Sequence, residues 1–116
     1  TESEVHDDEL ITFDDFQRID LRVAEVLTAK RVPKTDRLLE LGIRIGEEER
    51  TVVSGIAASY EPENMIGRKI VVVANLKPAK LRGIESQGML LAAEDNDGNL
   101  AIVEVPKETL SGSKVK

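Results

Sequence analysis

The sequence has 116 residues, 41% of them apolar and 33% charged, with a formal net charge of −6 and no cysteine. This composition allows one domain with an aliphatic core, and the absence of cysteine excludes disulfides, thiolate metal sites and cysteine nucleophiles. No run of about 18 apolar residues is present and the acidic start is unlike a signal peptide, so we expect a cytoplasmic protein without a membrane span.

The negative charge is concentrated at the N-terminus. Residues 1–15 contain seven acidic residues and neither lysine nor arginine, which leaves 16 basic and 15 acidic residues, a net charge of +1, in the rest of the chain. A block of like charges with few apolar residues is usually solvated. We therefore expect residues 1–10 to be an acidic tail or a linker from a larger protein, and residues 11–116 to be the folded domain.

A short helix is expected first, followed by strands. Thr12 is a good N-cap, and Asp15 three residues later nearly completes a capping box. Phe13 and Phe16 then share one face, which favours an apolar cap on a core or a subunit contact over base stacking. Period-two alternation, β-branched runs and Gly, Pro and Asp-Gly turn signals predict strands at residues 19–29, 39–45, 50–55, 69–75, 88–94 and 100–105.

Short strands without a βαβ pattern favour a small antiparallel barrel. Between the third and fourth strands, Pro62 suits the first turn of a short helix and Gly67 suits its end. The sequence thus predicts an all-β, five-stranded OB-fold barrel with a short helix between strands three and four, a short N-terminal helix and a C-terminal extension.

Two loops of this predicted barrel are basic. Residues 30–37 hold four basic residues against one acidic residue, and residues 68–87 hold five against one. An OB fold binds nucleic acids through the loops between strands one and two and between strands four and five, which are residues 30–37 and 76–87 here. Ordinary solvated loops would explain one basic cluster, but two clusters at the binding loops favour an anionic polymer. This hypothesis requires both loops to meet at one end of the barrel.

The side chains that would carry catalysis or hold a cofactor are missing. His6 is the only histidine, cysteine is absent, and neither a phosphate-binding P-loop nor a dinucleotide fingerprint occurs. Residues 95–99 resemble part of a calcium loop, but a hairpin turn explains their Asp-Gly pair better. We therefore expect no catalytic residue, no metal and no cofactor, and a domain that is not itself an enzyme.

A longer motif spans the second basic loop. It runs from residue 75 to residue 89 as Asn-Leu-Lys-Pro-Ala-Lys-Leu-Arg-Gly-Ile-Glu-Ser-Gln-Gly-Met, and shorter motifs are Asp-Leu-Arg-Val at 20–23, Asp-Arg-Leu at 36–38 and Val-Ser-Gly-Ile at 53–56. Together they resemble a tRNA-binding OB-fold family over residues 11–116. The family includes the C-terminal domain of methionyl-tRNA synthetases, the closest match, together with stand-alone bacterial tRNA-binding proteins, a bacterial secretion chaperone and cytokine-like domains of eukaryotic synthetase complexes. Ala24, where members often have Gly, and Arg37, where Lys is frequent, depart from the pattern.

The resemblance implies a homodimer that recognises the shape of tRNA, with the catalytic part of a synthetase as a further partner. It points to tRNA contacts in the second loop, and the first basic loop adds three cations. The candidate tRNA-binding residues are Asn75, Lys77, Lys80, Arg82, Ser86, Met89, Arg37, Lys34 and Lys30. Three aromatic residues cannot build a stacking platform, so backbone charge and shape must dominate recognition.

Several of these residues also have a purely structural interpretation. Asn75 at a strand end would satisfy loop backbone groups, Ser86 would form a turn, and Met89 would fill the core. Asp20 and Arg22, two apart on one strand face, favour a structural ion pair over RNA contact. The three cations of the second loop have little structural use, so they are the strongest candidates.

The leading hypothesis is a non-catalytic tRNA-binding and dimerisation domain of a methionyl-tRNA synthetase. The alternatives are a stand-alone tRNA-binding protein, a secretion-chaperone-like dimer that binds polypeptide, and an assembly domain without a ligand. The salt dependence of binding separates the tRNA-binding domain from the dimer that binds polypeptide, because RNA binding falls steeply with salt and apolar peptide binding does not.

Overall fold

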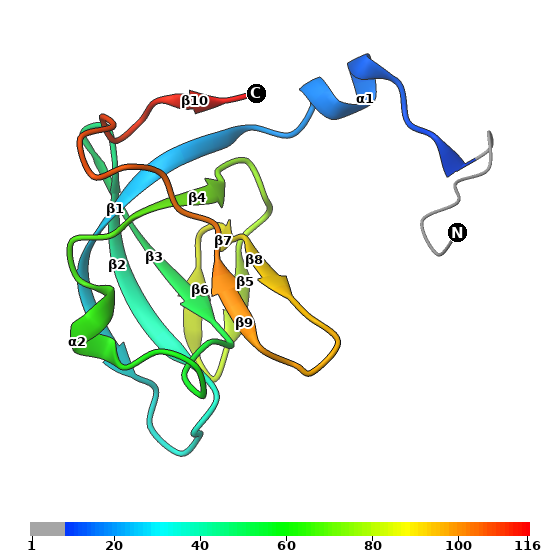
Figure 1. The fold of residues 1–116 in the computed structure, drawn as a ribbon. Coiled ribbons are helices and arrows are strands. Elements are labelled where there is room, and N and C mark those ends of the chain that lie inside the picture. Colours follow the sequence, from blue (N-terminus) through cyan, green and yellow to red (C-terminus); the bar gives the residue numbers. More distant parts are fainter. Residues whose placement is uncertain (1–8) are drawn as a thin grey trace.

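The computed structural model describes residues 9–116, so most of the expected acidic tail at 1–10, and His6, lie outside the described residues. Five antiparallel strands form a strongly curled half-barrel in the order β3-β2-β1-β4-β7, with β10 paired to the start of β1 (Figure 1). The strands are β1 (Leu21–Arg31), β2 (Leu39–Ile45), β3 (Glu48–Ser54), β4 (Lys69–Val73), β7 (Met89–Leu90) and β10 (Lys114–Val115). This architecture is the predicted all-β OB fold.

The interior of the barrel is aliphatic. Leu39, Leu41 and Ile43 of β2 point inward and are almost completely buried, and the residues between them lie on the outer face. On β4 the continuous β-branched run Ile70–Val73 is buried on both faces, as predicted. On β1, Ala24 and Val26 join the barrel core. The alternation recognised in the sequence therefore decides which side chains fill the barrel.

A bulge and a glycine let the sheet curl. The pairing of β1 with β2 shifts register between Val26 and Thr28, and such bulges increase the local twist. Opposite the bulge, a Cβ on Gly42 would collide with the Thr28 hydroxyl. Glycine at this position therefore allows the two strands to approach closely where the barrel bends.

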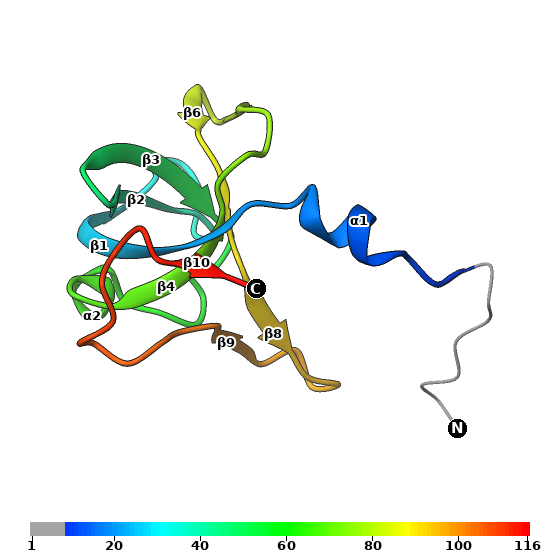
Figure 2. The same ribbon diagram turned by 90° about the horizontal axis from the view of Figure 1, so that it is seen from above.

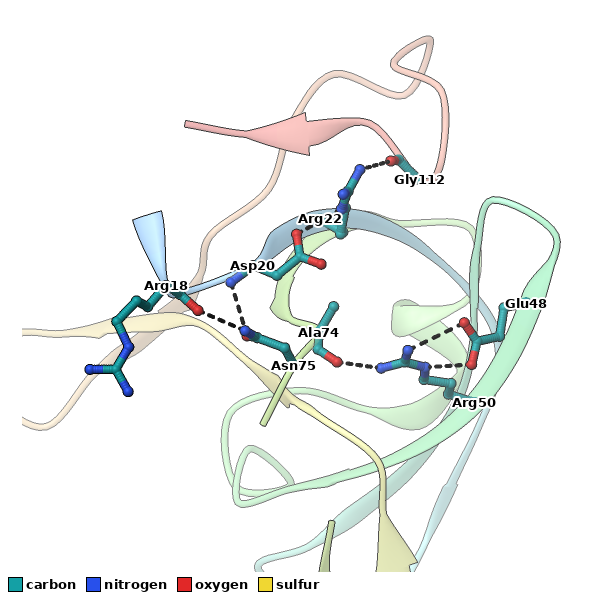
Figure 3. A network of polar contacts seen from close by, with 8 residues as sticks. All are labelled: Arg18, Asp20, Arg22, Glu48, Arg50, Ala74, Asn75 and Gly112. Carbon is teal, nitrogen blue, oxygen red and sulfur yellow. Dashed lines mark hydrogen bonds and ion pairs between the residues drawn. The ribbon is translucent and has the colours of Figure 1, made fainter. Parts of the chain in front are cut away.

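The barrel closes between β3 and the residues just before β7. The Gln87 N–H donates to the Thr51 carbonyl at 2.7 Å, and the Thr51 N–H donates to the Gln87 side-chain oxygen at 3.1 Å. Arg50 adds a second connection, because its guanidinium donates to the Ala74 carbonyl at 2.6 Å and pairs with Glu48 (Figure 3). These contacts hold the end of β4 and the approach to β7 against β3.

Two small hairpins extend the barrel. β5 (Ala79–Leu81) and β6 (Ile84–Ser86) form the first within residues 76–87, where we expected only a loop. β8 (Ala92–Glu94) and β9 (Leu100–Ile102) form the second. The expected strand 88–94 is thus divided into β7 and β8, and the strand expected to reach residue 105 ends at residue 102.

The two helices have different surroundings. α2 (Pro62–Met65) lies between β3 and β4 as predicted, and its Met65 is fully buried. α1 (Phe13–Gln17) has the complete capping box, yet it projects from the barrel and none of its residues is buried (Figures 1 and 2). Phe13 is 70% exposed, so the expected apolar cap on the core is wrong, and the expected subunit contact stays a prediction. Neither helix of the described part has the length and apolar character that a membrane crossing requires.

Candidate nucleic-acid interface

The two basic loops lie at the same end of the barrel, the lower end in Figure 1. The loop 32–38 joins β1 to β2, and the carbonyl of Arg37 accepts the N–H of Ala57 at 3.1 Å, just beyond the end of β3. From the other side, the hydroxyl of Ser86 accepts the N–H of Val53 in β3 at 2.9 Å. Both loops therefore flank the last residues of β3, which is the arrangement that the hypothesis of an anionic ligand requires.

The β5–β6 hairpin and its approach display three free cations. Lys77, Lys80 and Arg82 are exposed, and none of them forms an ion pair with another residue of the described part. The single acidic residue of the hairpin, Glu85, is the cross-strand neighbour of Lys80. Unpaired cations close together raise the local concentration of anions and steer their approach. The hairpin therefore presents a positive surface that no other group of the described chain neutralises by direct pairing.

The three candidate residues of the first basic cluster, Lys30, Lys34 and Arg37, are less uniform, and its fourth cation, Arg31, pairs with Glu61 at 3.1 Å. Lys30 lies in β1 rather than in the loop, which corrects the expected boundary, and its ammonium is 3.8 Å from Glu40. Lys34 and Arg37 lie in the loop, are exposed, and have no ion pair within residues 9–116. Lys34 and Arg37 are thus the members of this cluster with charge available for a ligand.

Lys34 and Arg82 hold their backbones in the left-handed region. Their φ angles are 69° and 53°, and they are the two non-glycine residues of the described chain with positive φ. In Arg82-Gly83 both central residues of the β5–β6 turn have positive φ, which is the requirement of a type I′ hairpin. Side chains other than Asn and Asp avoid this conformation because Cβ crowds the neighbouring carbonyl. Strain of this kind is concentrated at functional sites, and here it falls once in each basic loop.

Asn75 ties the chain after α1 to the end of β4. Its side-chain oxygen accepts the Asp20 N–H at 2.9 Å, and its amide donates to the Arg18 carbonyl at 2.7 Å (Figure 3). Beside it, Arg22 pairs with Asp20 at 2.8 Å and donates to the Gly112 carbonyl at 3.2 Å. The expected ion pair of Asp20 and Arg22 is confirmed, and the structural interpretation of Asn75 has both hydrogen-bond partners in place.

Ser86 and Met89 differ in what they offer to a ligand. Ser86 is 5% exposed, and its hydroxyl, which accepts from β3, also donates to the Gly88 carbonyl at 3.0 Å. That hydroxyl therefore holds the hairpin against the barrel. Met89 is 46% exposed, so it does not fill the core.

An apolar groove of about 530 Å³ opens between the hairpin and the barrel. The end of β3 and the residues of β7 form its sides, and Ala79 and Leu81 of β5 line it together with Leu76 and Met89. The exposed fractions of Leu76, Leu81 and Met89 are 48%, 39% and 46%. Exposed apolar side chains gathered around a hollow are typical of a binding surface.

Sequence reasoning missed two supports of this site, Arg50 and Gln87. Each fixes the approach to the groove through partners far along the chain. Gln87 lies within the motif at residues 75–89 without having been singled out, and no local pattern marks Arg50. The hydrogen bond and charge of Arg50 also lower the pKa of the Glu48 carboxyl below its ordinary value. Within residues 9–116 there is no group of three or more side chains suited to hold a metal ion.

Comparison with known proteins gives a consistent family. The model of a putative tRNA binding domain matches residues 21–114. A methionine–tRNA ligase of Deinococcus radiodurans is 61% identical over 109 residues, which are 94% of this chain and 16% of the ligase. The crystal structure of a MetRS-related protein from Pyrococcus horikoshii matches with a TM-score of 0.90 and 42% identity, covering 93% of this chain and 99% of that chain. The chaperone CsaA from Bacillus anthracis matches with a TM-score of 0.83 and 29% identity, over 92% of this chain and 99% of that one.

Proposed function

We propose that this chain, which belongs to the family of putative tRNA-binding domains, is a non-catalytic module that raises the tRNA affinity of a methionyl-tRNA synthetase in the cytoplasm. The chain spans about 16% of the ligase it matches, so such a module would act beside a separate catalytic part. Holding tRNA close raises its effective concentration at that part without new chemistry. The observation that carries the proposal is the position of two basic loops on either side of the end of β3.

In this proposal the free cations contact phosphates. Lys77, Lys80 and Arg82 of the hairpin face the RNA backbone together with Lys34 and Arg37 of the first loop. Phosphate contacts position a nucleic acid but carry no sequence information, so the domain would recognise the shape of tRNA. The other candidate residues support this surface: Asn75 and Ser86 position the chain, Lys30 is partly neutralised by Glu40, and Met89 lines the groove.

We also propose that the domain is a homodimer that uses the apolar surface around α1. Leu10, Ile11 and Phe13 are 59%, 66% and 70% exposed on a segment that projects from the barrel. Apolar side chains gathered on a projecting segment are suited to burial against a second copy. A dimer would double the number of phosphate contacts, and sedimentation of the wild type measures this state directly.

The test compares two triple variants with the same change in net charge. Lys77→Ala, Lys80→Ala and Arg82→Ala together remove the hairpin cations, and Lys107→Ala, Lys114→Ala and Lys116→Ala remove three exposed cations from the C-terminal segment. We expect the first variant to bind tRNA more weakly, with a slope of log K against log salt that is smaller by about 0.9 per lost phosphate contact. The second variant should keep most of the wild-type slope. A hairpin variant with wild-type affinity and slope would contradict the proposal.

A second candidate function is polypeptide binding, which the apolar groove and the likeness to a solved chaperone favour. An unfolded peptide bound in this groove would be held by apolar contacts. Its affinity should change little between low and high salt, whereas the affinity for tRNA should fall steeply. Titration of both ligands at several salt concentrations separates the two functions.

A further inference from the structure

The groove beside the β5–β6 hairpin combines an apolar interior with a cationic edge. Ala79 and Leu81 line it, and Lys80 between them projects to the other face of β5, because neighbouring residues of a strand alternate. Lys77 lies on the lining, and Arg82 lies at the turn beyond Leu81. Lys77 and Arg82 therefore provide positive charge at the edge of the groove, whereas Lys80 lies on the opposite face of the hairpin.

This combination limits the kind of ligand that fits. The volume of about 530 Å³ lies within the roughly 300–1,000 Å³ of typical small-molecule sites. A purely apolar ligand would leave the surrounding cations without partners. A phosphate group alone would gain nothing from the leucine and methionine side chains. A ligand that satisfies both has a flat apolar body with negative charges attached close by.

We infer that the groove holds one unpaired nucleobase of the bound tRNA, with the adjoining phosphates held by Lys77 and Arg82. The inference rests on the proposed function and names the part of the RNA that the groove takes. Unpaired bases in the loops and bulges of a folded RNA can be splayed out of the stack, and burial of such a base face between aliphatic side chains removes apolar surface from water. Met89 is suited to this contact because its thioether interacts favourably with aromatic rings. Ser54 also lines the groove, and no hydrogen bond links its hydroxyl to another residue of the described chain, which leaves that group for a base edge.

The test uses a pair of RNA probes that differ in one base. The first is an RNA hairpin with a single bulged adenosine, and the second is the same hairpin with an abasic ribose at the bulge, so that the number of phosphates is equal. Leu76→Gln with Met89→Gln makes the groove polar at two exposed positions. Leu110→Gln, at a residue that is 78% exposed in the C-terminal segment, is the matched control.

We expect wild-type protein and the control to bind the hairpin with the base about tenfold more tightly than the abasic hairpin, which is the gain from removing roughly 55 Å² of apolar base surface from water. The groove variant should bind both hairpins equally, and its tRNA affinity should fall by a similar factor. Its salt slope should equal that of the wild type, because the cations remain.

Two outcomes would overturn the inference while leaving the proposed function intact: equal binding of the two hairpins by the wild type, or unchanged discrimination in the groove variant. If the groove variant instead loses affinity for an unfolded polypeptide and keeps its discrimination, the groove is a peptide site and the inference fails. If the wild type shows no salt-dependent tRNA binding, the proposed function fails and the inference fails with it.

Discussion

Arg82 offers a way to separate backbone strain from charge. A residue other than glycine whose backbone is in the left-handed region costs roughly 1–2 kcal/mol of conformational free energy. Asn enters this region several-fold more often than most residues, which corresponds to about 1 kcal/mol. Arg82→Asn and Arg82→Ala remove the same charge, but only Asn relieves the strain at φ 53°. We therefore expect Arg82→Asn to be more stable than Arg82→Ala by about 1 kcal/mol, a difference in Tm of roughly 4 °C.

Urea denaturation of both variants measures the stability difference, and titration with tRNA over a series of salt concentrations measures the lost contact. Both variants should lose the same fraction of tRNA affinity, because both lack the guanidinium. Equal free energies of unfolding for the two variants would contradict the reasoning that the left-handed backbone at residue 82 strains the turn. Wild-type tRNA affinity in either variant would show that Arg82 does not contact RNA. The same pair of substitutions at Lys34, where φ is 69°, repeats the test in the other loop.

Three further tests probe the scaffold. A Cβ on Gly112 would lie 2.9 Å from Gly46 backbone atoms, whereas a Cβ on Gly67, which has the same φ of +91°, would enter open space. Gly112→Ala should therefore lower the free energy of unfolding, measured with urea, by about 1–3 kcal/mol more than Gly67→Ala. Asn75→Ala should cost about 1 kcal/mol of unfolding free energy but leave the salt slope of tRNA binding unchanged, and a smaller slope would instead indicate an RNA contact. Hydrogen bonds from Asn99 and the turn after Asp95 lower the pKa of the Asp95 carboxyl below its ordinary value of 3.8. The ionised carboxylate therefore stabilises the fold fully above pH 3.8, and this stabilisation is lost as the pH falls through the lowered pKa. Asp95→Asn should therefore weaken the acid dependence of the unfolding free energy, measured by urea denaturation at a series of pH values.

The parts of the fold that depend on local pattern were predictable from the sequence. In β2 the alternation of Leu39, Leu41 and Ile43 with polar or small residues identifies both the strand and its buried face. The pair of Asp20 and Arg22 was predictable for the same reason, because residues two apart on a strand share a face. Patterns of this kind need only the geometry of one element.

The closure of the barrel was not predictable in this way. Arg50 donates to Ala74 and to Gln87, which are 24 and 37 residues away, and these partners are defined only after β4 and the hairpin are placed. The β5–β6 hairpin was missed for a different reason. Its turn has Arg rather than Asn or Gly at the first position with positive φ, so the usual turn signal is weak.

The motif at residues 75–89 combines residues that shape the loop with residues that add charge to it. Asn75 and Ser86 have their polar groups occupied by backbone partners, so within the described chain they act on the shape of the loop. Lys77, Lys80 and Arg82 have no such partners, so they add charge without defining the shape. A motif can therefore be specific for a loop geometry while only part of it is free to touch a ligand. The sequence therefore marks a candidate interface, and the hydrogen bonds of the folded chain separate the residues that shape it from those whose charge is free for a ligand.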